Sequence, residues 1–397
     1  MFKQITRTVW IVSLVSLFND FSSEMLYPVV PLYLKQIGYG TLLIGILEGV
    51  AEFLSGFSKM YTGTLSDQFQ KRLPFIQWGY FMSVLARPLI GISSFASLIF
   101  VGRSIDRIGK GIRSGARDAI LSDECDANNK AEVFGFHRSM DTLGAIFGPL
   151  VAMIYLYFRP GHLVDLFFIT LIPGLMAVFL TTFIKEKKTQ QAERKVSYSI
   201  RKNLSYYTYA PKAYLLLLIP LLLFSLVNSS DMFLLLKAKD AGLSDQQTIF
   251  LYLLFNLVYA FFAFPLGKLA DKFGRTRIFV VGLFIFSLTY FAFAWSTSLY
   301  LIIGLFITYG LFYAMTQGIV KAMILQRVPK DQKATAIGFY EGLNSIGLLL
   351  ANTVAGFIWY QYGASSLFYY TGIVTLICIG LLIFTVSKQK QLSSELI

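Results

Sequence analysis

The 397-residue sequence has few of the residue types that build metal sites and disulfide frameworks. It contains two cysteines and two histidines, and none of them has the close spacing of metal ligands. Cys125 and Cys378 lie far apart in the chain, which excludes a disulfide framework. No nucleophile–base pair and no glycine loop in the context of a phosphate site is present. We therefore expect neither an enzyme nor a bound cofactor or metal.

Charge is also scarce, since charged residues make up 14% of the chain against roughly 25% in soluble domains. Apolar residues take their place at 55%, in repeated runs of about 20 residues that are long enough to cross a bilayer. We predict an all-α polytopic membrane protein with twelve spans. The expected spans are 8–36, 41–66, 74–94, 97–121, 131–158, 163–184, 212–237, 247–270, 277–295, 298–326, 333–361 and 365–387.

The net charge of +13 comes from basic residues that cluster in alternate loops. This pattern is typical of the positive-inside rule and not of a nucleic-acid surface. It predicts that both termini are cytoplasmic in a multi-pass protein of the cytoplasmic (inner) membrane. The first apolar run continues without a small-residue cleavage site, so we expect a retained first span and not a signal peptide.

A basic, polar segment over 185–211 divides the chain into two predicted six-helix bundles, 1–184 and 212–397. The bundles repeat, because Gly63-Thr-Leu-Ser-Asp67 recurs as Gly267-Lys-Leu-Ala-Asp271. Ser-Leu-Phe-Asn at 16–19 likewise recurs as Ser-Leu-Val-Asn at 225–228. Internal duplication is typical of transporters that bind their substrate between two related halves.

On these residues the whole chain resembles the major facilitator superfamily. The loops 63–72 and 267–277 match its G-x-L-x-D-x-x-G-[RK]-[RK] signature, although Gln70 stands where the family prefers glycine. Gly144, Gly148 and Pro149 resemble its antiporter-type motif, and the row 106–118 matches a poorly characterised bacterial subset. The resemblance implies two pseudo-symmetric six-helix bundles and a proton-driven secondary transporter that works by rocker-switch alternating access.

The signature loops and the span-five motif supply the expected gating residues. We expect Gly63 and Gly267 to form tight turns, and the following aspartates to accept backbone amides of the next helix. Arg113 or Arg117 is expected to pair with Asp67 in a conformational latch. The gating set is Gly63, Asp67, Arg72, Arg113, Arg117, Asp118, Gly144, Gly148, Pro149, Gly267, Asp271 and Arg275.

Span four carries the most informative stretch, because Arg103, Arg107, Lys110 and Arg117 fall within roughly 80° of one helical face. One charge at the centre of a bilayer costs about 2.5–3.5 kcal/mol, so this stripe must face protein or a wet cavity. Acids and bases nearly balance in the first half. Two interpretations stay open: a structural network of ion pairs, and groups that are unpaired in one state and bind protons or substrate.

Five carboxylates are the candidate proton carriers. Asp20 and Glu24 are four residues apart in span one, as are Glu48 and Glu52 in span two, so each pair lies on one helical face. Asp20, Glu52 and Asp141 are the preferred carriers because they lie near mid-span. His137 is expected to be a packing residue and not a carrier.

Arginine forks match carboxylates and phosphates, and we expect the substrate to contact basic residues of the first half. Buried polar residues of the second half would add hydrogen bonds, whereas Asp231 is expected to lie too near the outer surface. The predicted substrate-binding set is Arg103, Arg107, Lys110, Arg87, Arg138, Asn228, Asn256, Tyr259, Gln317, Glu341 and Asn344.

The sequence therefore predicts a monomeric, proton-coupled transporter of a small anionic or zwitterionic organic solute, with no cofactor. The resemblance favours export by exchange with protons. One alternative is a multidrug exporter of lipophilic cations, with Asp20, Glu24 or Glu52 as the partner of the cation. Another is a sensor or lipid-interacting protein that does not transport. No motif indicates a particular substrate.

Overall fold

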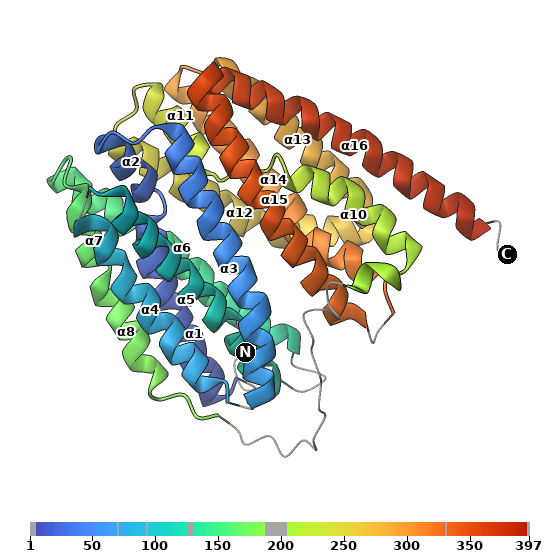
Figure 1. The fold of residues 1–397 in the computed structure, drawn as a ribbon, viewed down its shortest axis with the longest axis horizontal. Coiled ribbons are helices and arrows are strands. Elements are labelled where there is room, and N and C mark those ends of the chain that lie inside the picture. Colours follow the sequence, from blue (N-terminus) through green and yellow to red (C-terminus); the bar gives the residue numbers. More distant parts are fainter. Residues whose placement is uncertain are drawn as a thin grey trace. The chain divides into compact units, whose positions relative to one another are not determined.

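The structure is a computed structural model that describes residues 5–69, 71–92, 94–125, 130–186, 205–329 and 332–394. Helices form all the regular secondary structure of these residues, as predicted (Figure 1). The chain divides into two compact units. Unit 1 comprises Met1–Tyr39, Val50–Ser197 and Ser244–Leu253, and unit 2 comprises Gly40–Gly49, Tyr198–Leu243 and Leu254–Ile397.

Unit 1 is built on α1, which packs against α6 and α8, and on α4, which packs against α5, α7 and α8. Most of α3 and the first turns of α12 also belong to it. The helix bounds are α1 Arg7–Leu26, α2 Val29–Gln36, α3 Thr41–Phe69, α4 Leu73–Ile92, α5 Ala96–Asp123, α6 Lys130–Phe158, α7 Leu163–Ile169 and α8 Leu171–Thr181.

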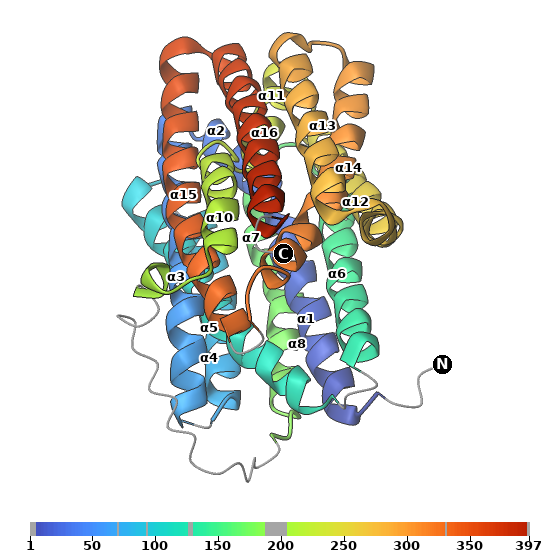
Figure 2. The ribbon, with the colours of Figure 1, turned by 90° about the vertical axis from the view of Figure 1, so that its right-hand side faces the viewer.

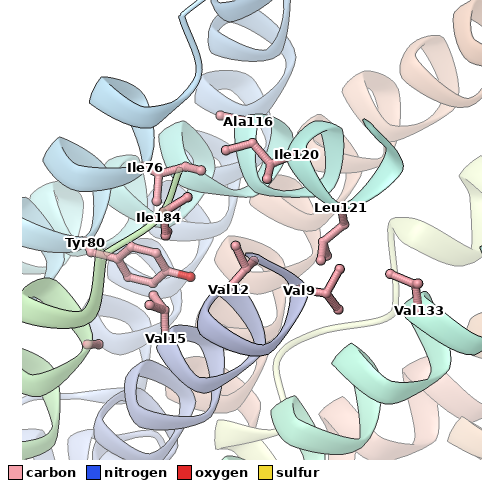
Figure 3. Packing of buried hydrophobic residues seen from close by; sticks show 11 residues of the cluster. Val9, Val12, Val15, Ile76, Tyr80, Ala116, Ile120, Leu121, Val133 and Ile184 are labelled. Carbon is pink, nitrogen blue, oxygen red and sulfur yellow. The ribbon is translucent and has the colours of Figure 1, made fainter. Parts of the chain in front are cut away.

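Apolar side chains at helical spacing hold one end of unit 1 together. Val9, Val12 and Val15 lie on one face of α1 and contact Tyr80 of α4 and Ile120 of α5 in a fully buried cluster (Figure 3). Spacing of three residues places successive side chains on the same side of a helix. This packing fixes the rotation of α1, and with it the direction of the polar side chains one turn further along.

The glycines of the span-five motif allow α6 to lie directly against α1. A Cβ atom on Gly148 would stand 2.6 Å from both Met25 N and Phe21 O, and one on Gly144 would meet Leu17 O. These two positions therefore accept no side chain without a shift of the backbone. The motif functions as a close-packing surface in this structure, and it places α6 beside the carboxylate-bearing turn of α1.

Unit 2 is organised around α13, which packs against α14 and α16, and α10, which packs against α15 and α16 (Figure 2). The first turn of α3 packs here against α15, where Thr41 Oγ1 donates a hydrogen bond to Gly356 O at 3.4 Å. The helix bounds are α10 Lys212–Ser225, α11 Met232–Asp240, α12 Asp245–Phe273, α13 Arg275–Trp295, α14 Leu299–Leu325, α15 Lys333–Tyr362 and α16 Ala364–Ser394, with a short 3₁₀ helix η1 at Ser205–Thr208.

Nine predicted spans correspond to single helices, and three are broken into two. The first break lies between Leu26 and Val29, next to Pro28. The second is at Thr170, and the third lies between Ser225 and Met232. Eight helices of the described residues are long and apolar enough to cross a membrane. The charged α5 is not among them, because its stripe lowers its hydropathy. The number of twelve spans and the division at 185–211 stay predictions.

The expectation of tight turns at the first glycine of each signature loop is wrong. Gly63 lies within α3 and Gly267 within α12, since hydrogen-bonded helix continues for another six residues in each case. The turn in the second copy is at Gly274, whose φ of 100° lies in the region that favours glycine. We expected Asp271 to accept hydrogen bonds from backbone amides. Its Oδ1 instead accepts a hydrogen bond of 2.8 Å from Nη2 of Arg275.

Candidate functional site

A small polar cavity of about 20 Å³ lies among α1, α2, α4 and α5 of unit 1. Five cationic and two acidic side chains line it, together with small and apolar ones. The lining residues are Ser23, Glu24, Leu26, Tyr27, Val30, Arg87, Ile90, Arg103, Asp106, Arg107, Lys110 and Arg113. The cavity thus brings together four of the predicted substrate-binding residues, and its walls carry an excess of positive charge.

Arg87 lines the cavity and is 2% exposed. Its Nε lies 3.4 Å from Asp106 Oδ1, and its Nη2 donates to Asn19 Oδ1 at 3.2 Å. A further bond runs from Nη1 to Ser22 Oγ. Arg103 Nη1 lies 3.8 Å from the other oxygen of Asp106. The carboxylate of Asp106 therefore lies within 4 Å of two guanidinium groups.

The next turn of α5 carries one paired and one unpaired cation. Arg107 Nη1 lies 3.2 Å from Glu52 Oε1. Lys110 is exposed, and its ammonium group forms no ion pair or hydrogen bond with any residue that the structure describes. Ammonium groups donate to carboxylates and phosphates as point charges. Lys110 is consequently the cation of this cavity that is most available to an anionic ligand.

Glu24 faces the basic wall of the cavity from α1. Its Oε2 accepts a hydrogen bond of 2.6 Å from the hydroxyl of Tyr252, which lies on the part of α12 that belongs to unit 1. Tyr252 also stacks on Tyr27, with ring centroids 5.0 Å apart. The carboxylate is therefore fixed by a neutral donor, and it adds one negative charge to the cavity.

Asp20 lies one turn before Glu24 and does not line the cavity. Asn19 Nδ2 donates to its Oδ1 at 3.0 Å. Within the described residues its carboxylate has no ion-pair partner. A carboxylate in this setting loses little on protonation, because no salt bridge is broken. This geometry is compatible with the predicted role of Asp20 as a proton carrier.

A second polar cluster joins α1, α5 and α6. His137 Nδ1 lies 3.3 Å from Ser13 Oγ, and its Nε2 lies 3.6 Å from Asp141 Oδ1. Arg117 donates to Ser16 Oγ at 3.1 Å. Asp141 Oδ1 is buried and makes no hydrogen bond with the described atoms. Asp141 therefore keeps free acceptor capacity at Oδ1, and its role as a proton carrier stays a prediction.

The structure gives the gating residues several partners. Arg113 donates to Ser83 Oγ at 3.1 Å and lies over the ring of Tyr80, while Arg117 pairs with Asp118 at 3.0 Å. The side chain of Asp67 lies outside the described residues, so the latch between it and α5 stays a prediction.

Arg72 contacts Asp123 at the end of α5. Its backbone N–H donates to Glu186 at 2.8 Å, and the N–H of Leu73 donates to the same carboxylate at 3.3 Å. Glu186 thus caps the start of α4.

The remaining candidates do not line this cavity. Arg138 is exposed on α6, and Glu48 is buried in the turn of α3 that belongs to unit 2. Glu341 pairs with Lys321 at 2.7 Å. Other members of unit 2 are Asn228, Asn256, Tyr259, Gln317 and Asn344. The Oδ1 atom of Asn228 is buried without a hydrogen bond among the described atoms.

Asp231, which we expected to lie too near the outer surface, is only 8% exposed and accepts a 2.5 Å hydrogen bond from Tyr309. The sequence reasoning missed a polar stripe at Ser13, Ser16, Asn19 and Ser22, all fully buried on α1. Its spacing of three residues within an apolar span marks one helical face, and this signal was available in the sequence.

The sequence model of the Major Facilitator Superfamily matches residues 12–238 and 232–395 of this chain. An MFS-type transporter of Methanocaldococcus jannaschii is 31% identical over 389 residues, which are 96% of each chain. This chain belongs to the major facilitator superfamily. It is a multi-pass membrane protein of a transporter family. The predicted all-α fold of this family is confirmed.

More distant relatives carry functional names of their own. The multi-drug resistance efflux pump PmrA of Streptococcus pneumoniae is 25% identical over 380 residues, 89% of each chain. The nucleoside transporter NupG has a TM-score of 0.81 and 13% identity, over 96% of this chain and 100% of that one. The human organic anion transporter MFSD10 has a TM-score of 0.68 and 16% identity, over 95% and 99%. At these identities the two structures support the fold alone.

Proposed function

We propose that this protein is a proton-coupled secondary transporter of a small anionic or zwitterionic organic solute. It works by rocker-switch alternating access in the cytoplasmic membrane, as a monomer, with both termini in the cytoplasm. The excess of positive charge in the unit 1 cavity carries the proposal. Lys110, whose ammonium group has no ion pair or hydrogen bond with the described residues, is the residue that first contacts the anionic group of the substrate.

The roles of the other residues follow from their contacts. Arg87, Arg103 and Arg107 surround the cavity and share Asp106 and Glu52 as counter-charges. A substrate carboxylate or phosphate would replace part of this pairing through bidentate hydrogen bonds. Asp20 and Asp141 are the proposed proton carriers, because neither forms an ion pair with an arginine or a lysine among the described residues.

The test is a thermal-shift screen of the detergent-purified protein against organic anions, with lipophilic cations as the comparison set. A ligand that binds the folded state raises the midpoint of unfolding. We expect stabilisation by anions, lost in Lys110→Gln and retained in Lys212→Gln. Lys212 is a matched control because it is exposed at the start of α10, outside the cavity. A hit is then assayed for counterflow in liposomes at two pH values.

A multidrug efflux pump is the second candidate. The similarity to PmrA favours it, and Asp20 or Glu24 would then pair with a lipophilic cation. Stabilisation by tetraphenylphosphonium and not by anions, together with broad drug resistance on expression in an efflux-deficient host, would favour this function over the first.

A further inference from the structure

The side-chain amide of Asn19 connects the proposed proton carrier with the wall of the cavity. Its Nδ2 donates to Asp20 Oδ1 at 3.0 Å, and its Oδ1 accepts from Arg87 Nη2 at 3.2 Å. Asn19 is 1% exposed, so water does not compete for these bonds. Both ends of one amide dipole are thus engaged, the positive end by a carboxylate and the negative end by a guanidinium.

A charge-assisted hydrogen bond is roughly twice as strong as a neutral one. While Asp20 is ionised, its charge holds the amide in the orientation that directs Oδ1 at Arg87. Protonation removes this charge and weakens the hold. The hydrogen bond between Arg87 and Asn19 on α1 is then weaker, whereas the ion pair between Arg87 and Asp106 is unchanged. The guanidinium becomes more available to an anion in the cavity.

We infer that Asn19 is a positioning residue that makes the binding of a proton at Asp20 and of an anion in the unit 1 cavity cooperative. The inference rests on the proposed function. It adds that proton binding strengthens anion binding and does not weaken it. Linkage requires that each ligand strengthens the other by the same factor. Cooperative binding is the thermodynamic condition for symport, and it differs from the antiport that the Gly144–Pro149 resemblance implies.

Several other charged groups also face Asp20 and affect how readily its carboxylate binds a proton. The charged and titratable groups that face it are Glu24 on α1, Arg87 on α4, Lys110, Arg113 and Arg117 on α5, and His137 and Asp141 on α6. The α8 helix, which packs on α1, carries no ionisable residue. A cation in the cavity would have the opposite effect, because it would compete with the proton. The sign of the pH dependence therefore separates the anion transporter from the multidrug pump.

Sulfate is a suitable probe because it keeps both charges between about pH 5.5 and pH 8, so that a change in affinity arises in the protein. Its binding to the full-length protein is measured by titration calorimetry at constant ionic strength. We expect binding about fivefold tighter at the lower pH. Asp20→Asn should bind tightly at both pH values, and Asn19→Ala should bind with a ratio near one.

Asn352→Ala is the matched control. Asn352 is a buried asparagine that bonds Ser230 N and Leu348 O in unit 2, and its variant should keep the wild-type ratio. If Asn19→Ala does not fold, the isosteric Asp20→Asn carries the test. Equal or weaker binding at low pH, or a wild-type ratio in Asp20→Asn or Asn19→Ala, overturns the inference alone. Absence of sulfate binding, or undiminished binding in Lys110→Gln, overturns the anion site and with it the proposed function.

Discussion

The hydroxyl of Tyr252 donates a 2.6 Å hydrogen bond to Glu24 across 228 residues of sequence. It thereby attaches the first turns of α12 to α1 within unit 1. The sequence presents these two residues in different halves of the chain, and nothing in their local pattern connects them.

Replacement of Tyr252 by phenylalanine removes the neutral donor of the Glu24 carboxylate. Glu24 is half-buried, and the loss of one hydrogen bond costs about 0.5–1.5 kcal/mol. We therefore expect a lower free energy of unfolding and a lower midpoint in thermal denaturation. Tyr207→Phe is the control, because Tyr207 is exposed and its hydroxyl makes no contact with the described residues. Equal midpoints for the two variants would contradict the prediction.

A methyl group on Gly148 has no room against α1. Overpacking of this kind costs about 1–3 kcal/mol, and we expect Gly148→Ala to unfold at a lower temperature. Gly135→Ala in the same helix meets no atom within 4 Å, and it should be neutral or stabilising by up to about 1 kcal/mol. The prediction fails if the two variants shift the midpoint in the same direction.

Arg107 and Glu52 form an ion pair, and we expect their replacement to change sulfate affinity in opposite directions. Arg107→Ala removes a donor of the anion site and should weaken sulfate binding by about tenfold or more. Glu52→Gln releases Arg107 from its counter-charge and should strengthen binding. Titration calorimetry of both variants measures the two effects. A change of the same sign in both would show that this pair supports the fold and does not contribute to the anion site.

The hydrogen bond from Tyr309 to Asp231 joins two helical segments of unit 2. Tyr309→Phe should lower the free energy of unfolding by about 1–3 kcal/mol and leave sulfate affinity unchanged, because neither residue lines the cavity. Tyr300→Phe, at an 85% exposed position, is the control. A large loss of sulfate affinity in Tyr309→Phe would assign the cluster to the binding site.

Much of the fold could be predicted because apolar runs alone specify where helices begin and end in a membrane. The bounds of α4 and α14, for example, differ from the predicted spans by no more than two residues. The breaks in three spans were missed. Only the break at Pro28 has a local signal, because proline removes a backbone donor, whereas the break before Met232 lies in an ordinary polar stretch.

The cavity was predictable in part for a related reason. The stripe on α5 is a property of one helix, so Arg103, Arg107 and Lys110 could be placed on a common face from their spacing. The partners could not be placed, because Arg87 meets Asn19 only through the packing of α4 and α1. Contacts of this kind depend on the rotation of both helices, which the sequence of either one does not contain.

Glu186 caps the first turn of α4 with both oxygens of its carboxylate, at the end of unit 1 where Arg72 also contacts Asp123. Glu186 is therefore fixed to the start of α4. Anyone who splits the chain for co-expression of two fragments, or inserts a fluorescent reporter or protease site, should cut after residue 186. A cut before it would remove a cap from the helix that carries Arg87.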